Sequence, residues 1–320
     1  MTGVAGNVYT LAFAKQSAKG AAAAANSGYK LKLTSGEVGP NRNFLTLQET
    51  DASRQQGDTV VVGAQVQGTP EWYIRPEEFP LFGFAALGAN VDSGAGPFTH
   101  TQTPAQRPPY LTVWKNLGAG TIIDKYTDVT LGSIELSGGA GQALACKVDA
   151  MGLGVLLGTT DNSQPIVSGH VYTYPECSVS LAGSIPATVE QWTITANNNA
   201  EYIQADNSLT PYDVVLGRLE VSGSYTYLLQ SDADYRKFHS GSSVGTAFTT
   251  TLFTEAIDIG MAAGTSSIHA IMAGVAVTAY PVPPDVSGKP IRVAATFSSL
   301  PQVAISDYLS FVTTNSIASY

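Results

Sequence analysis

The segment Pro211–His239 constrains the fold most, because two other regions of the chain repeat parts of it. Asp128–Gly138 and Asp213–Gly223 share seven of eleven residues at an offset of 85. Asp58–Phe82 repeats the order of features instead: a valine strand broken by glycine, a strand with aromatic residues, two acids and a short aromatic-rich helix. Repetition of this kind predicts a duplicated chain.

We interpret the second repeat, which pairs Gly63 with Gly217 at an offset of 154, as the domain repeat. An 85-residue unit would leave the acidic and aromatic segments without counterparts, so the 85-residue match indicates one hairpin chemistry used twice. A chain of 320 residues is long enough for two domains of ordinary size. The sequence therefore predicts a first domain over residues 1–164 and a second over residues 165–320.

The composition favours a protein that works in an assembly. Charged residues make up 13% of the chain, against about 25% in average soluble proteins, so we expect part of the surface to be buried against partners. The net charge is −9 and basic residues are not clustered. This argues against a protein that grips nucleic-acid phosphates, since such proteins carry a basic stripe.

Residues 1–36 are predicted to form an N-terminal arm. They contain four lysines and no acid, and their longest apolar run is Ala21–Ala25. A signal peptide needs about 7–15 apolar residues and a transmembrane helix about 20, so we expect neither. We interpret the segment as a short strand followed by an extended arm, with a nascent helix at Ala21–Ala25 as the alternative.

The first half carries an antiparallel β pattern with one short helix. The helix is predicted from Pro80 to Gly88, because proline fits the first turn and glycine fits just past the end. Residues 89–109, rich in Gly, Pro, Ser and Thr, are predicted to form a long loop. Alternation of apolar residues predicts strands at 44–47, 60–66 and 111–114, and a hairpin formed by 130–138 and 142–150.

The second half repeats this layout. Strands are predicted at 178–181, 191–196, 214–221, 225–229, 269–280 and 291–297. A short helix is predicted after Ser231, with a capping-type start and Gly241 as its stop. The predicted fold class is thus mainly β: two tandem antiparallel β-sandwich or barrel domains, each with one short helix, plus the extended arm and long loops.

Motifs that resemble catalytic sites are better explained as loops or helix starts. Gly241–Gly245 matches G-x-S-x-G but follows a helix instead of a strand. Gly152–Gly158 has the wrong spacing for a dinucleotide fingerprint, and Glu77 and Glu78 are explained by a helix start. The histidines lack metal-ligand spacing. We therefore predict no catalytic residue, no cofactor and no metal site.

Two cysteines, Cys146 and Cys177, either pair or stay reduced.

Several segments together resemble a known family, the tail tube (major tail) proteins of long-tailed bacteriophages, of the type with two tube domains. The resemblance covers nearly the whole chain and rests on the order of its pieces. These are AKQSAKG, RPEEFPLFGFAALG, PFTHTQTP leading to PPYLTVW, DVTLGSIELSGGAGQALACKVDAMG, and WTITANNNAEY followed by DVVLGRLEVSG.

The resemblance implies a structural virion protein of the tail, present in the host cytoplasm during assembly. Its rings stack into a tube around a tape-measure protein, contact tail terminator and tail-tip proteins, and later conduct DNA into the host without binding it specifically. No membrane contact is implied. Two tube domains per chain imply trimeric rings with pseudo-sixfold symmetry, with hexameric rings as the alternative.

The residues suggest roles within such a tube. Three copies carry a formal charge of −27, three times −9, and an acidic channel would repel DNA phosphates. We expect Glu135 and Glu220 to line the channel, with an outer solvated face as the alternative. Contacts between subunits or rings are predicted for the arm and the 89–109 loop, through Lys15, Lys19, Tyr29, Phe98 and His100.

Two other function classes remain open on the sequence. One is a monomeric carbohydrate-binding or adhesin-like β protein, and the other is a hydrolase that uses Ser243. Neither accounts as well for a charge-poor, duplicated β chain.

Overall fold

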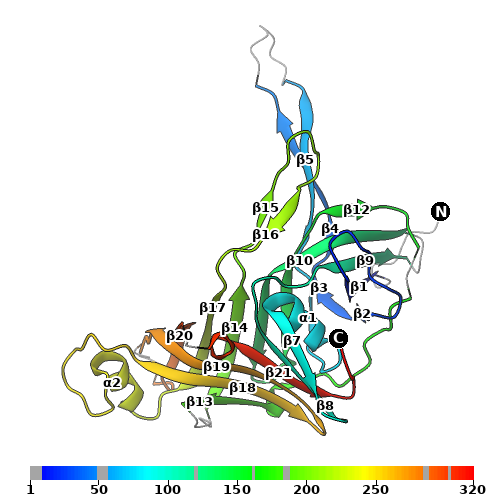
Figure 1. The fold of residues 1–320 in the computed structure, drawn as a ribbon. Helices are drawn as coiled ribbons and strands as arrows, with labels where there is room; N and C mark the ends of the chain where they lie inside the picture. Colours follow the sequence, from blue (N-terminus) through cyan, green and yellow to red (C-terminus); the bar gives the residue numbers. More distant parts are fainter. Residues whose placement is uncertain are drawn as a thin grey trace.

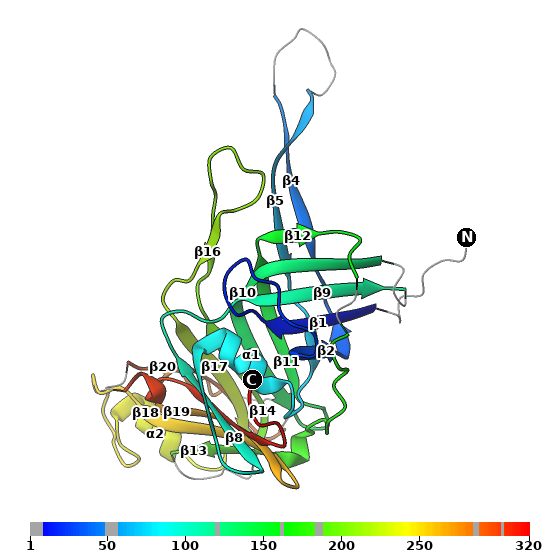
Figure 2. The ribbon, with the colours of Figure 1, turned by 45° about the vertical axis from the view of Figure 1, so that its right-hand side comes forward.

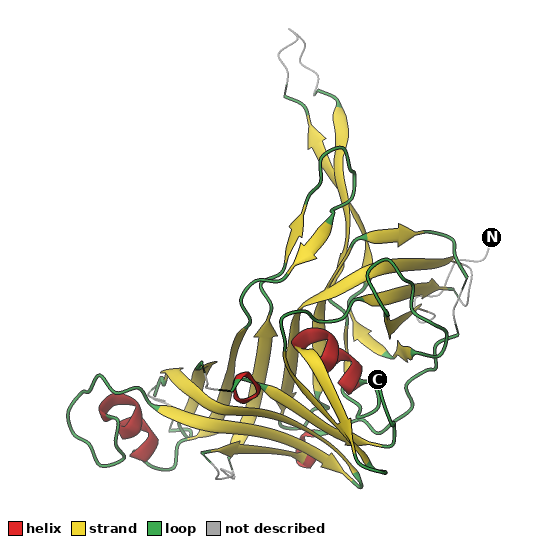
Figure 3. Cartoon of the chain, in the orientation of Figure 1, coloured by secondary structure: helices red, strands yellow, loops and turns green. Residues whose placement is uncertain are grey.

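The computed structural model of the chain describes residues 9–48, 57–118, 122–160, 163–182, 188–283, 288–301 and 304–320. Over these residues the protein is mainly β, with two short α-helices and a large antiparallel sheet (Figure 1, Figure 3). The prediction of a mainly β fold with two short helices is confirmed.

One sheet runs through both halves of the chain. Its eight strands, each hydrogen-bonded to the next, follow the order β4, β5, β11, β10, β14, β17, β20, β19. The pairing of β10 with β14 joins the two halves. The strands are Val38–Thr46 (β4), Thr59–Gly68 (β5), Ala145–Gly152 (β11), Ile122–Gly139 (β10), Val189–Asn197 (β14), Glu220–Leu228 (β17), Arg292–Ser299 (β20) and Ser266–Ala279 (β19).

Further strands and, within the described ranges, two 3-10 helices border this sheet. The strands are Tyr9–Lys15 (β1), Gly28–Leu31 (β2), Leu33–Ser35 (β3), Glu71–Tyr73 (β6), Gly88–Ser93 (β7), Phe98–Pro104 (β8), Leu111–Leu117 (β9), Gly154–Leu156 (β12), Cys177–Leu181 (β13), Glu201–Ile203 (β15), Asp213–Val215 (β16), Thr254–Ala263 (β18) and Ser310–Asn315 (β21). The 3-10 helices are Tyr174–Glu176 (η2) and Ile305–Asp307 (η3).

The same set of strand pairings occurs twice. In the first half β1 pairs with β9, β9 with β10, β10 with β11 and β12, β11 with β5, and β5 with β4. In the second half β13 pairs with β18, β18 with β19, β19 with β20 and β21, β20 with β17, and β17 with β14. We call these the first and second strand sets.

Helix α1 (Phe79–Leu87) and helix α2 (Ala233–Ser240) begin 154 residues apart, which is the predicted offset. Each ends at a glycine with a left-handed backbone, Gly88 (φ 104°) and Gly241 (φ 71°), as predicted. At the predicted capping start of α2, the Ser231 hydroxyl accepts from the amide of Ala233 at 3.4 Å. The N-cap residue Asp232 makes no capping hydrogen bond and instead pairs with Arg236 one turn later (2.6 Å).

The apolar core lies on one face of the sheet because the side chains alternate along each strand. On β10 the side chains of Ile134 and Leu136 are buried, as predicted, and Val148 lies opposite Ile134 on β11. Helix α1 covers this face, and the ring centroids of Phe82 and Trp72 are 4.5 Å apart. The other face of the sheet is left uncovered by the core.

Two hairpins project from the sheet in the same direction (Figure 1, Figure 2). One is formed by β4 and β5, and the other by β15 and β16, which connect β14 to β17. They contact each other, since the amide of Ala64 donates to the carbonyl oxygen of Leu209 (2.8 Å) and the Tyr202 hydroxyl donates to the carbonyl oxygen of Val66.

Three sequence-based expectations are wrong. Residues 89–109 are not one long loop, because β7 and β8 pair as a hairpin and β8 also pairs with β21. Residues 28–35 of the N-terminal arm do not project from the fold, because β2 folds back on β1 and β3 pairs with β6. Residues 220–228 form one strand through Gly223, whereas separate strands were predicted at 214–221 and 225–229. Residues 1–8 of the predicted arm lie outside the described residues.

Candidate channel and assembly surfaces

The uncovered face of the eight-strand sheet is built from small polar side chains in rows that cross the strands. One row runs through directly opposed residues from β6 to β20 and reads Glu71, Lys147, Glu135, Thr195, Ser222, Ser298. The next row reads Asp149, Ser133, Asn197, Glu220. Glu135 and Glu220 therefore lie on the same face of one sheet, in adjacent rows. We call this surface the polar sheet face.

The polar sheet face is acidic at one end and hydroxyl-rich at the other. Lys147 is the basic residue in these two rows. It lies between Glu71 on β6 and Glu135 on β10. Burial raises the pKa of the Asp149 carboxyl above its usual range. Beyond β10 the rows continue with Ser, Thr and Asn residues and the acidic Glu220. The neutral groups make weaker hydrogen bonds to phosphate than a cation does. The surface therefore offers DNA little to hold it.

The projecting hairpins carry apolar side chains that solvent reaches. Phe44 is 62% exposed at the outer part of the hairpin, and a contiguous exposed apolar surface usually marks a protein contact. We call this surface the apolar arm. Its exposed residues are Phe44, Leu45, Val60, Val61 and Val62 on β4–β5, with Leu209, Tyr212 and Val215 on β15–β16. In the sequence, the visible sign of this surface is the run Val60–Val62 broken by Gly63.

Three of the residues predicted to contact other subunits meet around Tyr320 of the same chain. Lys15 donates from Nζ to the main-chain oxygen of Tyr320 (2.5 Å), and burial lowers the pKa of this lysine. The Tyr29 and Tyr320 rings lie 6.3 Å apart, and the buried His100 ring meets Tyr320 edge to face at 4.8 Å. Phe98 lies on β8 opposite Asn315.

Asn315 organises this cluster. Its Nδ2 donates to the carbonyl oxygen of Pro76 (2.6 Å) and to the Tyr320 hydroxyl (2.8 Å), while its Oδ1 accepts from the amide of Ile317 (2.8 Å). The same Oδ1 lies 3.0 Å from Nε2 of His100, so Nε2 carries a hydrogen. The other ring nitrogen, Nδ1, lies 2.7 Å from Asp92. These contacts hold the end of β21 on the first strand set.

Lys19 lies away from this cluster. Its Nζ is 3.0 Å from a carboxylate oxygen of Asp213 and 4.9 Å from the centre of the Tyr212 ring. This contact ties the segment after β1 to the β16 hairpin. That Lys15, Lys19, Tyr29, Phe98 and His100 also contact other subunits stays a prediction.

Of the two acids before α1, Glu78 is buried and Glu77 is partly buried. Glu78 accepts a hydrogen bond from the amide of Arg75 at 2.9 Å. Burial raises the pKa of Glu78 to about 8, so the group favours its neutral form. Such a shift in an enzyme often marks an acid or base, but here the carboxyl lies within the core and not in a cleft.

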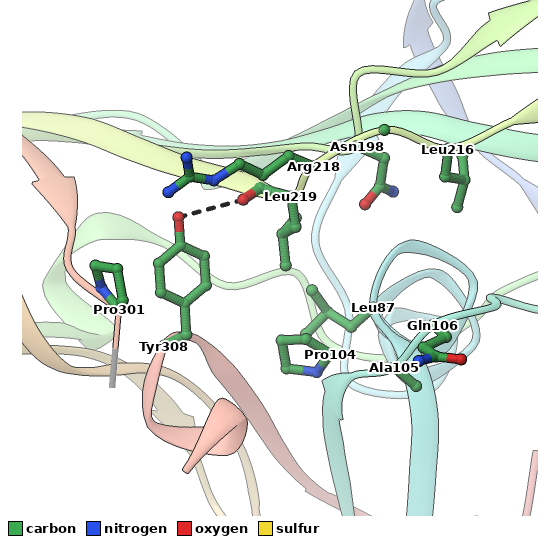
Figure 4. Close-up of a pocket in the computed structure, with 11 residues that line it drawn as sticks. Leu87, Pro104, Ala105, Gln106, Asn198, Leu216, Arg218, Leu219, Pro301 and Tyr308 are labelled. Atoms are coloured by element: carbon green, nitrogen blue, oxygen red, sulfur yellow. Dashed lines mark hydrogen bonds between the residues drawn. The ribbon is translucent and has the colours of Figure 1, made fainter. Parts of the chain in front are cut away.

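A pocket of about 460 Å³ lies where the two strand sets meet (Figure 4). The Tyr308 hydroxyl donates across it to the carbonyl oxygen of Leu219 (3.3 Å). None of the described residues that line it carries a carboxylate, an imidazole or a thiol, so they supply no such acid, base or nucleophile for catalysis. The lining residues are Leu87, Pro104, Ala105, Gln106, Asn198, Leu216, Gly217, Arg218, Leu219, Pro301 and Tyr308.

The motifs set aside on the sequence do not form a reactive site either. Gly241 caps α2 and Ser243 lies in the exposed turn after it, so the G-x-S-x-G match is not a strand-to-helix elbow. Cys146 is buried and Cys177 is partly buried, and both are free thiols. Over the described ranges, no group of three or more His, Cys, Asp or Glu residues is arranged to hold a metal ion.

Among the helices that the structure describes, none has the length and apolar character needed to cross a membrane. No curated protein matches the chain. A model of the phage tail tube protein family matches residues 6–298. The match covers nearly all of the sequence, and the chain therefore belongs to the phage tail tube protein family, as a structural protein of the phage tail and not an enzyme.

Proposed function

We propose that three copies of this chain form a ring of six tube domains, two per chain, and that stacked rings make the tail tube. Family membership implies self-polymerisation into a tube. The two repeated sets of strand pairings support a division into a first domain, residues 1–164, and a second, residues 165–320. The connection around Tyr172, whose amide donates to the carbonyl oxygen of Ile74, contacts the first half of the chain before β13 begins the second strand set.

The ring closes through a strand edge that the single chain leaves open. Within the chain, β14 pairs with β17 on one side and with β10 on the other. Its counterpart β4 pairs with β5 alone among the described residues. An unpaired edge is a template for another strand, so a neighbouring copy docks along β4 and continues the sheet around the ring.

The polar sheet face then lines the channel. The apolar face of the sheet is occupied by the core and α1, so only the polar face is free to meet DNA. Glu135 and Glu220 add negative charge to a surface otherwise rich in Ser and Thr. Phosphates are repelled there instead of being neutralised, and DNA slides through without specific binding. The tape-measure protein occupies the same channel before DNA does.

The apolar arm makes the contact between rings. It projects beyond the sheet in one direction (Figure 1), and its exposed Phe44, Val60 and Val61 favour burial against the next ring. At the two ends of the tube the same surfaces meet the terminator and tail-tip proteins.

Electron microscopy of the purified chain tests this function. Negative-stain images at low and high concentration are expected to show rings and hollow tubes, with three copies per ring in top views. Six copies would replace the trimer by a hexamer. A chain that stays monomeric at every concentration, also when added to preformed tail ends, would contradict polymerisation.

A double substitution separates stacking from ring formation. Phe44→Ser with Val61→Ser is expected to leave rings but abolish tubes. Val91→Ser is the matched control, because Val91 is 63% exposed, like Phe44, but lies on β7. If the double variant polymerises as well as the control, the apolar arm does not join rings.

A further inference from the structure

Strand β21, the last of the second strand set, has neighbours on both sides. It pairs with β19 of its own set and with β8 of the hairpin that follows α1 in the first set. The hairpin that follows α1 in the first half of the chain thus pairs with the last strand of the second set. This contact and the β10–β14 contact both join the first set to the second.

The counterpart of β21 is β12, and its outer edge is open. Among the described residues β12 pairs with β10 alone. Its side chains and those just after it are exposed and apolar: Val155, Leu156 and Leu157. An edge strand with exposed apolar side chains is a site for β-augmentation.

The counterpart of the β7–β8 hairpin is the segment 241–253, which follows α2 and precedes β18. It lies outside every strand, and Phe248 is 87% exposed, while Val244 and Leu252 are exposed as well. Its second half reads TAFTTTLF, a composition that favours strands. In an extended conformation Phe248, Thr250 and Leu252 share one face.

We propose that residues 246–252 of one copy form a strand along β12 of a second copy in the same ring, as β8 does on β21 within the chain. The partner is a second copy because the contact repeats one that the chain already makes between its own strand sets. Phe248 and Leu252 then cover Val155 and Leu157, and two exposed apolar surfaces are buried together. The inference rests on the proposed polymerisation.

Disulfide trapping between two chains that each carry one introduced cysteine tests this contact. Both chains carry Cys177→Ser, and the buried Cys146 is kept. One chain, enlarged by a tag, carries Phe248→Cys, and the other carries Val155→Cys. After co-assembly and mild oxidation, a product that joins a tagged and an untagged chain is expected at least tenfold above a control mixture. The control pairs Phe248→Cys with Ile166→Cys, a site off β12 that is more exposed than Val155.

The outcomes separate the two proposals. Tubes that form without a product above the control would overturn this contact and leave the tube function intact. An unsubstituted chain that never polymerises would overturn both.

A backbone substitution gives an independent measurement. Thr250→Pro removes an amide that a strand would use, and Thr250 is exposed and outside every strand of the single chain. The concentration needed for assembly is expected to rise at least tenfold, while the melting temperature of the monomer stays unchanged. Thr250→Ala is the matched control, with a change below twofold. Equal assembly of the two variants would contradict the proposal.

Discussion

Gly68 and Gly223 occupy the same place in two matching strand pairs. Gly68 on β5 lies opposite Val38 of β4, and Gly223 on β17 lies opposite Ile194 of β14. A Cβ atom added to Gly68 would lie 1.9 Å from the carbonyl oxygen of Glu37, and one added to Gly223 would lie 2.2 Å from that of Thr193. Both positions therefore require glycine for the same reason, a partner backbone that approaches too closely for any side chain.

The first prediction concerns this close approach. Gly223→Ala places a methyl group against the Thr193 carbonyl and the Phe297 ring, 2.4 Å away. Overpacking of this kind costs about 1–3 kcal/mol of the free energy of unfolding. Urea denaturation of the monomer measures the loss, and Ser222→Ala on the neighbouring exposed position is expected to change it by less than about 0.5 kcal/mol. Equal stability of the two variants would contradict the geometry.

The second prediction concerns the channel charge. Glu135→Lys with Glu220→Lys changes the formal charge of the polar sheet face by four units per chain, two at each site. Assembled tubes are expected to retain DNA in a co-sedimentation assay, with retention that falls steeply as salt rises, because each new phosphate contact releases counterions.

The control for the charge reversal places the same change outside the sheet. Asp232→Lys with Asp307→Lys alters two exposed acids, at the start of α2 and in η3. In the same co-sedimentation assay, tubes of this control variant should retain as little DNA as tubes of the unchanged protein. If both double variants retain DNA alike, net charge matters and the polar sheet face does not line the channel.

The third prediction concerns pH. Burial raises the pKa of Glu78 to about 8, whereas a solvated glutamate has a pKa of about 4.3. Between these two values the unfolded chain loses the proton and the folded chain keeps it. The free energy of unfolding therefore falls as pH rises through this window, by at most about 1.4 kcal/mol per pH unit, and levels off above pH 8.

Glu78→Gln removes this dependence and keeps an oxygen that accepts from the Arg75 amide. The variant is expected to be more stable than the unchanged protein at pH 8 and equally stable at pH 4, in thermal melts of the monomer. Glu201→Gln, at an exposed position of β15, should follow the unchanged protein at both values. If the Glu78→Gln variant has the same pH profile as the unchanged protein, Glu78 is ionised in the folded chain.

The fourth prediction concerns the cluster around Tyr320. Asn315→Ala leaves the Pro76 carbonyl and the His100 Nε2 hydrogen without their partner, and Asn315 is buried. Each unsatisfied buried group costs about 1–3 kcal/mol. We expect a loss of about 2–4 kcal/mol in the free energy of unfolding. Amide exchange at Ile317 should become at least tenfold faster.

Asn41→Ala, on the exposed part of β4, serves as the control for this measurement. It should leave both the stability of the monomer and the exchange at Ile317 unchanged. An Asn315 variant that unfolds like the control would mean that Lys15, the Glu77 carbonyl oxygen and the ring contacts hold Tyr320 without Asn315.

The elements that could be predicted from the sequence are those determined by residues close together in the chain. The two helices were found from Pro80, Gly88 and Gly241, and the β10–β11 hairpin from the alternation around Glu135. The repeat offset of 154 residues matched the helix starts because duplicated elements keep their spacing. The family resemblance was confirmed over residues 6–298.

Long-range pairing accounts for what the sequence did not predict. Residues 89–109 look like a loop because they are rich in Gly, Pro, Ser and Thr. In the structure β8 lies between β7 and β21. There Asn90 accepts from Nε2 of Gln102, and Asp92 and Asn315 bind the two ring nitrogens of His100. The tight match of residues 128–138 with 213–223 did not mark equivalent strands, since the first segment lies in the continuous β10 and the second is divided between β16 and β17. The apolar arm was missed because an exposed valine run looks like a buried strand.

The pairing of β10 with β14 changes how such a ring is put together. In a ring of six domains, half of the contacts between neighbouring domains are already present in each chain before any two chains meet. Two associations of free chains followed by closure form the ring, instead of five for six separate domains, and each association avoided spares the loss of translational and rotational freedom that joining two free bodies entails. The β10–β14 contact forms within one chain, whereas a contact at the edge of β4 would form between chains. The sequences at the two places are therefore free to diverge, and with them the strengths of the two contacts.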